Sequence, residues 1–100
     1  MSARNATADA ELIDGARMGS VEDVRRALSG GASVDAVDEL NNTPLHLAAA
    51  AGSTAAVQSL LEAGADPTVC NAAGHTALDI AVFGENRGCA VAIQDFTDGR

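Results

Sequence analysis

The chain has 100 residues, a formal net charge of −8 and 22 alanines, but no lysine, tryptophan or tyrosine and only two phenylalanines. This length predicts one domain, no apolar run approaches the roughly 20 residues that cross a bilayer, and the acidity disfavours a nucleic-acid partner, which needs a cationic face. Because alanine buries little apolar area, the composition allows either a partly disordered chain or helices that small side chains bring unusually close together.

Two short helices are predicted within residues 9–38. The first covers residues 11–18, with Asp9 as its N-terminal cap. The second helix follows Ser20, another capping residue, and ends at Gly30. The segment is therefore expected to form a helix-turn-helix unit.

Residues 39–71 repeat this arrangement with clearer signals. Thr43 supplies a capping hydroxyl, and Pro44 occupies the first helical position, where a missing N–H has no consequence. Gly52 ends this helix, and a second helix ends at Gly64. The apolar side chains of the second helix recur at spacings of three and four residues: Val57, Leu60 and Leu61.

Residues 72–94 are a weaker version of the same unit. Gly84 arrives one residue earlier than the pattern requires, and Gly88 falls inside the expected last helix. Each glycine within a helix lowers its stability by about 1 kcal/mol relative to alanine. We therefore expect this end to be the least stable part of the fold.

The three segments are related by a shift of 33 residues. Shifting the first segment onto the second aligns eight identical pairs: Leu12 and Leu45, Ala16 and Ala49, Gly19 and Gly52, Ser20 and Ser53, Val24 and Val57, Leu28 and Leu61, Gly31 and Gly64, and Ala32 and Ala65. A fixed period of this length indicates a repeat architecture, in which each unit buries its apolar face against the next.

Residues 42–49, with the sequence Asn-Thr-Pro-Leu-His-Leu-Ala-Ala, closely resemble the ankyrin repeat, as does the run Leu-Leu-Glu-Ala-Gly-Ala-Asp-Pro at 60–67. The resemblance implies an all-α repeat solenoid of stacked helix-turn-helix units with β-hairpin fingers. It implies one domain at 9–96 with repeats at 9–38, 39–71 and 72–94, between mobile tails at 1–8 and 97–100. The implied structural motif positions are Thr43, Pro44, Leu45, His46, Gly52, Gly64 and Gly74. Asn41 stands where the next finger has Gly74, and asparagine tolerates the left-handed conformation needed there.

Catalytic, metal and cofactor sites are not expected. The two histidines and two cysteines lack the spacing of metal ligands or of a disulfide framework. In the ankyrin pattern the histidine at position 46 hydrogen-bonds locally, so we interpret it as structural. Cys89 is interpreted as a small apolar core residue and Cys70 as more exposed. A small His/Asp-dependent enzyme is the remote alternative, with His75 and Asp79 four residues apart.

The resemblance also implies a concave groove, lined by finger tips and first helices, where ankyrin stacks bind partner proteins. The corresponding positions here are Arg17, Met18, Glu39, Leu40, Asn42, Ala50, Ala51, Ala72, Ala73, His75 and Phe83. The acidic charge favours a partner helix or extended segment carrying basic residues.

We accordingly expect a non-catalytic protein–protein interaction module that binds neither nucleic acid nor membrane and is a monomer. A regulatory inhibitor of a partner enzyme, such as a kinase, is the alternative. Residues 1–20 contain no apolar signal-peptide region, so a cytoplasmic or nuclear location is expected.

Overall fold

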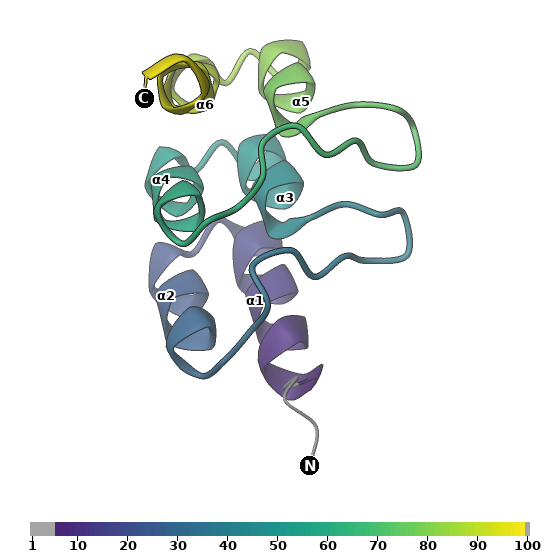
Figure 1. The fold of residues 1–100 in the computed structure, drawn as a ribbon, viewed down its shortest axis with the longest axis vertical. Coiled ribbons are helices and arrows are strands. Elements are labelled where there is room, and N and C mark those ends of the chain that lie inside the picture. Colours follow the sequence, from purple (N-terminus) through teal and green to yellow (C-terminus); the bar gives the residue numbers. More distant parts are fainter. Residues whose placement is uncertain (1–5, 100) are drawn as a thin grey trace.

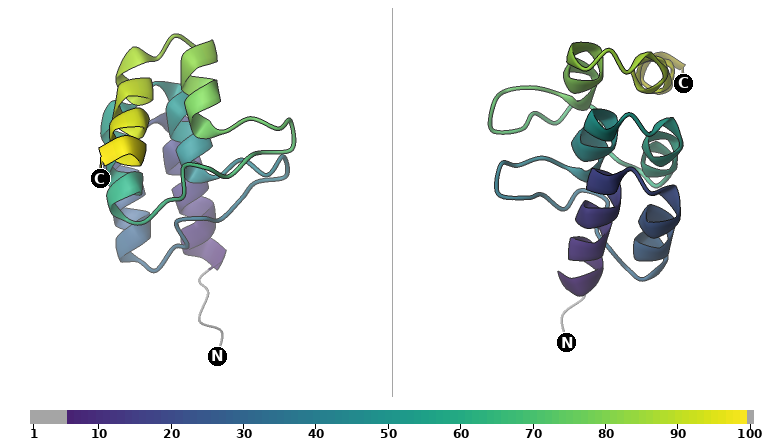
Figure 2. Two further views of the ribbon diagram at one scale, coloured as in Figure 1. Left: turned by 45° about the horizontal axis from the view of Figure 1, so that its top comes forward. Right: turned by 180° about the vertical axis from the view of Figure 1, so that it is seen from behind.

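Three antiparallel helix pairs stack along the long axis of the molecule (Figure 1). The computed structural model describes residues 6–99 and measures 40 × 25 × 25 Å. Its helices are α1 (Ala6–Met18), α2 (Val21–Ser29), α3 (Pro44–Ala51), α4 (Thr54–Glu62), α5 (Ala77–Phe83) and α6 (Arg87–Gly99). Helices α1, α3 and α5 form the layer next to two projecting loops, and α2, α4 and α6 form the outer layer (Figure 2). The predicted all-α repeat solenoid is confirmed.

Two predicted capping residues, Ser20 and Thr43, begin α2 and α3, and Ser53 and Thr76 begin α4 and α5 in the same way. The hydroxyls of Ser20, Thr43, Ser53 and Thr76 each accept a hydrogen bond from the backbone N–H three residues later. At Thr43 and Thr76 the side chain of the third helical residue also accepts from the capping residue's N–H, which completes a capping box. These bonds satisfy backbone donors that a helix leaves unpaired at its first turn.

Helix α1 begins at Ala6, so the predicted capping role of Asp9 is wrong. The Asp9 carboxylate instead accepts a hydrogen bond of 2.7 Å from the backbone N–H of Ser33, and Ala8 is buried. The Asp9 carboxylate therefore makes a tertiary contact with Ser33 and does not cap its own helix. Burial of Ala8 stabilises the extra helical turn before Asp9. Because α6 likewise continues through residues 97–99, neither expected tail boundary coincides with a helix end. The remaining tail residues, 1–5 and 100, lie outside the described residues.

Small side chains fill the space between neighbouring helices. Ala16, Ala48, Ala49 and Ala81 have no exposed surface, and larger residues such as Leu45 pack around them. Because alanine side chains are small, the helix backbones can lie close together. The core is therefore densely packed although it contains few bulky side chains. The alanine-rich composition therefore reflects close packing.

The two projecting loops are the expected fingers (Figures 1 and 2). No strand is present in residues 6–99, so the fingers are hydrogen-bonded turns that are too short to form β-hairpin ladders. One closing bond in each finger runs from the N–H of Asp38 to the carbonyl of Asn42, and from that of Asn71 to His75. Asn41 has φ 60° and Gly74 has φ 85°, which confirms the left-handed conformation predicted for Asn41.

The third unit departs from its predecessors at the turn between its helices. Gly19 and Gly52 have φ values of 72° and 76°, and the equivalent position in the third unit is Glu85 with φ 59°. Gly84, the residue before it, has φ −86°. The early glycine therefore does not supply the left-handed residue, and a glutamate adopts this less favourable conformation.

Candidate partner-binding groove

One predicted residue from each inner helix lies at the same place in the repeat. Arg17, Ala50 and Phe83 are 33 residues apart, occupy α1, α3 and α5, and are all exposed. Arg17 forms an ion pair with Asp38 in the first finger, and Phe83 packs on His75 at the base of the second. The column formed by these three residues is therefore flanked by the fingers.

The end of the groove near α1 is polar. A cavity of about 450 Å³ lies between α1 and the first finger. It is lined by Ala10, Ile13, Asp14, Arg17, Val37, Asp38 and Glu39. The guanidinium of Arg17 lies 3.5 Å from Asp14 and 3.4 Å from Asp38, so its charge is compensated inside the groove and the exposed Glu39 carboxylate adds to the acidic rim.

Asp38 shapes the first finger, although it was not among the predicted site residues. Its carboxylate accepts hydrogen bonds from the backbone N–H groups of Leu40 and Asn42, both at 2.9 Å, and from the Asn42 side chain at 3.3 Å. Burial by itself raises the pKa of the Asp38 carboxyl, but the bonds from Asn42 and Leu40, with the charge of Arg17, outweigh it and leave the pKa below its ordinary value. Asn71, 33 residues later, accepts from Ala73 and His75 in the same way. The sequence signal that could have identified this role is an Asp or Asn at the same position of both repeats, Asp38 and Asn71.

The two fingers are tied to each other. The N–H of Ala72 donates to the carbonyl of Leu40 at 2.9 Å, and the Asn71 amide donates to the Asn42 side-chain oxygen at 2.8 Å. Leu40 and Ala72, both predicted site residues, are thus brought together at the finger tips. These bonds between repeats hold the tips in a fixed relation, which reduces the entropy that a partner's binding must overcome.

The end of the groove near α5 is apolar. The rings of His75 and Phe83 pack edge to face with centroids 5.0 Å apart, and Phe83 is 67% exposed. Ala50 on α3 and Ala73 on the second finger offer small exposed side chains, and Leu40, next to Glu39 on the first finger, is 63% exposed. This end can accept an apolar side chain of a partner.

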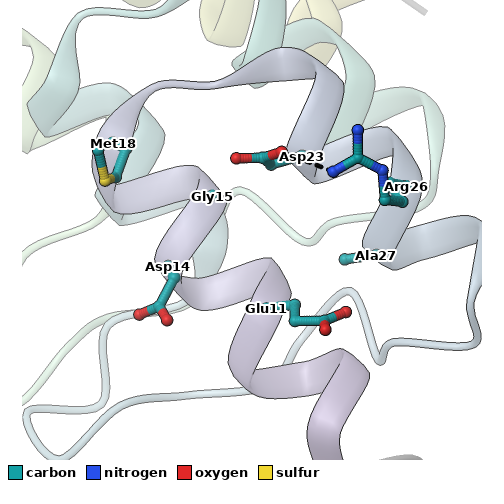
Figure 3. A pocket seen from close by; sticks show the side chains of 7 residues that line it. All are labelled: Glu11, Asp14, Gly15, Met18, Asp23, Arg26 and Ala27. Atoms are coloured by element: carbon teal, nitrogen blue, oxygen red, sulfur yellow. Dashed lines mark hydrogen bonds and ion pairs between the residues drawn. The ribbon is translucent and has the colours of Figure 1, made fainter.

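Met18 lies outside the groove. It lines a cavity of about 270 Å³ between α1 and α2 at the amino-terminal end of the stack (Figure 3). The other lining residues are Glu11, Asp14, Gly15, Asp23, Arg26 and Ala27. Position 18 follows the groove column by one residue, which is a rotation of about 100° on a helix, so the side chain turns toward the end of the stack. Ala51 occupies the equivalent position in α3, where its Cβ lies beside Gly19.

The comparison with known families decides what this arrangement is. A family model described as "Ankyrin repeats (many copies)" matches residues 28–81, more than half of the chain. The chain belongs to the ankyrin repeat family. Ankyrin repeats are protein–protein interaction modules, so the stack of helix pairs and fingers described here is a binding scaffold.

The chain matches a short part of several much longer proteins. The mouse palmitoyltransferase ZDHHC13 is 48% identical over 56 residues, which is 55% of this chain and 9% of the relative. The bovine inactive serine/threonine-protein kinase TEX14 is 37% identical over 86 residues, 86% of this chain and 6% of the relative. The mouse ankyrin repeat and SOCS box protein 16 is 43% identical over 58 residues, covering 58% of this chain and 13% of that protein. The chain therefore spans a small part of each relative's length, and their whole-protein activities do not transfer to it.

His46, the histidine of the ankyrin motif, is buried and bonded on both ring nitrogens. Nδ1 accepts from the backbone N–H of Thr43 at 3.1 Å, and Nε2 lies 2.9 Å from the carbonyl oxygen of His75. This network assigns the proton to Nε2, which donates to His75. Both ring nitrogens of His46 are therefore engaged by contacts within the fold, as expected for a structural histidine.

Asp79, the carboxylate of the enzymatic alternative, caps helix α5. Asp79 Oδ2 accepts from the backbone N–H of Thr76 at 3.1 Å as part of a capping box, while the ring of His75 packs on Phe83. Within residues 6–99 there is no group of three histidine, cysteine or acidic residues arranged to hold a metal. The same residues include no helix long and apolar enough to cross a membrane.

Proposed function

We propose that this ankyrin repeat protein binds a partner protein in the groove between the column Arg17, Ala50 and Phe83 and the two fingers. The observation that carries the proposal is the difference between the two ends of the groove. Asp14, Asp38 and Glu39 outnumber Arg17 at its acidic end, and Phe83 is the exposed aromatic side chain at its other end. A partner helix or extended segment with a basic residue at one end and an apolar residue at the other matches both.

The chain offers a matched pair of variants for the test, because it has only two phenylalanines. Phe83 is 67% exposed in the groove, and Phe96 is 48% exposed on the opposite side of the stack, beside Leu61 and Ala92. A partner obtained by affinity capture is titrated into wild-type, Phe83→Ser and Phe96→Ser proteins. We expect Phe83→Ser to weaken binding about tenfold or more, as loss of a central aromatic contact does, and Phe96→Ser to bind like wild type.

Two further variants test the polar and tip positions. Glu39→Lys should weaken binding, and the wild-type affinity should fall as salt is raised, because exposed charge pairs are screened. Leu40→Asp should weaken binding without unfolding the exposed finger tip, with folding checked by far-UV circular dichroism. Unchanged affinity in both Phe83→Ser and Leu40→Asp would falsify the groove assignment.

The alternative function expected from the sequence is that this protein inhibits its partner enzyme. If the captured partner is an enzyme such as a kinase, its activity is measured with increasing amounts of this protein. A fall in activity that Phe83→Ser abolishes supports inhibition through the groove, and full activity at saturation excludes it.

A further inference from the structure

The carboxy-terminal end of the stack exposes a face that is covered in the other two units. Val82 on α5 is 58% exposed, whereas its equivalents Ala16 and Ala49 are completely buried by the following unit. On α6 the half-buried Ala90 stands where the fully buried Val57 lies in α4. No described helix packs beyond α5 and α6 (Figure 2). We call this surface the end face.

The end face carries one acidic and one basic side chain. A cavity of about 510 Å³ opens on it, lined by Ala81, Val82, Glu85, Arg87 and Ala90. The side chains of Glu85 and Arg87 are exposed and form no ion pair within residues 6–99. An apolar centre with unpaired charges of both signs is complementary to itself, as an interface around a two-fold axis must be.

Head-to-tail stacking of a second copy does not fit this face. At Gly52 an added Cβ would lie 3.0 Å from Asn86 Oδ1 in the next unit, and at Gly19 it would lie 3.3 Å from the Cβ of Ser53. Both contacts show that the following unit packs closely on this turn. Glu85 occupies the equivalent position, so its side chain fills the space that another unit stacked in register would need.

We propose that the end face pairs with the same face of a second copy around a two-fold axis. Val82 lies at the centre of this interface, and Glu85 of each copy lies opposite Arg87 of the other. The inference departs from the monomer expected from the sequence, because the exposure of Val82 becomes visible only in the folded stack. It uses a surface separate from the groove and does not depend on the proposed function.

The test measures association of the purified chain by sedimentation velocity over a range of concentrations up to millimolar. Wild type should show a concentration-dependent dimer, and Val82→Asp should weaken it at least about tenfold because it buries a charge. Val37→Asp, at a valine 48% exposed in the first finger, is the matched control and should dimerise like wild type. Far-UV circular dichroism checks that each variant is folded.

Charge reversal distinguishes the two-fold arrangement from other contacts. Arg87→Glu alone places glutamates opposite each other, and Glu85→Arg alone places arginines opposite each other, so each variant should be monomeric. An equimolar mixture restores both opposite-charge pairs and should form a mixed dimer. A wild-type monomer at all concentrations, a dimer that survives Val82→Asp, or folded variants that fail to associate when mixed would each overturn the proposal.

Discussion

The ring of His46 joins two repeats through the backbone of His75. Its Nε2 lies 2.9 Å from the His75 carbonyl oxygen, while Nδ1 binds the backbone of its own unit at Thr43. One buried side chain thereby fixes the start of α3 and the base of the second finger. The relative position of the two fingers, and with it the shape of the groove, depends on this link.

Replacing His46 should therefore destabilise the fold. We expect His46→Ala to lower the free energy of unfolding by about 2–3 kcal/mol, because two buried bonds are lost and the Thr43 N–H loses its partner. His75→Ala keeps the accepting carbonyl and removes only a half-buried ring that packs on Phe83, so it should cost about 1 kcal/mol or less. Urea denaturation of the two variants provides the measurement, and equal losses would contradict the role assigned to His46.

Two glycines with the same left-handed backbone should respond differently to alanine. Gly52 has φ 76° and Gly74 has φ 85°, but an added Cβ meets no atom within 4 Å at Gly74 and lies 3.0 Å from Asn86 Oδ1 at Gly52. Gly74→Ala should cost about 1 kcal/mol from the backbone alone. Gly52→Ala should cost about 1 kcal/mol more, because Asn86 must move and its 2.7 Å bond to the Ala49 carbonyl weakens. Thermal and urea unfolding measure the difference; a smaller loss at Gly52 would be inconsistent with close packing between the repeats.

Asp38 should make stability depend on pH in the acidic range. Its folded-state pKa lies below its ordinary value, so its contribution is present above about pH 4 and is lost as the pH falls through the folded-state pKa. Asp38→Asn should therefore cost about 1–2 kcal/mol at neutral pH and progressively less in acid. Asp35→Asn removes the same charge at an exposed position nearby and serves as the control for net charge. A deficit in Asp38→Asn that stays constant from neutral pH into acid would argue against this role.

The two cysteines should differ in reactivity. Cys89 is 1% exposed, and burial raises the pKa of its thiol, opposed in part by a hydrogen bond with Thr54. Cys70 is exposed on the second finger. At about pH 8, Cys70 should react with a thiol reagent at least about 100-fold faster than Cys89, because the thiolate is the reactive form and Cys89 must first become accessible. In denaturant both should react at similar rates; equally fast labelling in the folded protein would refute the assigned burial of Cys89.

Local sequence signals predicted the repeating helix-turn-helix units of this protein. The 33-residue period set the number and order of the units, and the predicted caps Ser20 and Thr43 begin α2 and α3. These features depend on a few neighbouring residues, since a cap binds the backbone three residues away and a left-handed turn favours glycine or asparagine. The cap assigned to Asp9 is the exception, because a residue 24 positions away, Ser33, takes its carboxylate.

The surfaces that are available for binding depend on how the units pack against one another. Arg17 and Met18 are adjacent in the chain, yet one lines the groove and the other lines the amino-terminal end of the stack. The link from His46 to His75 and the exposure of Val82 likewise depend on which unit packs on which. Such contacts join residues one repeat apart, and the direction of a side chain on a packed helix is fixed by its neighbours in the stack. The period therefore identified the scaffold, and the stacking of its units formed the groove and the end face.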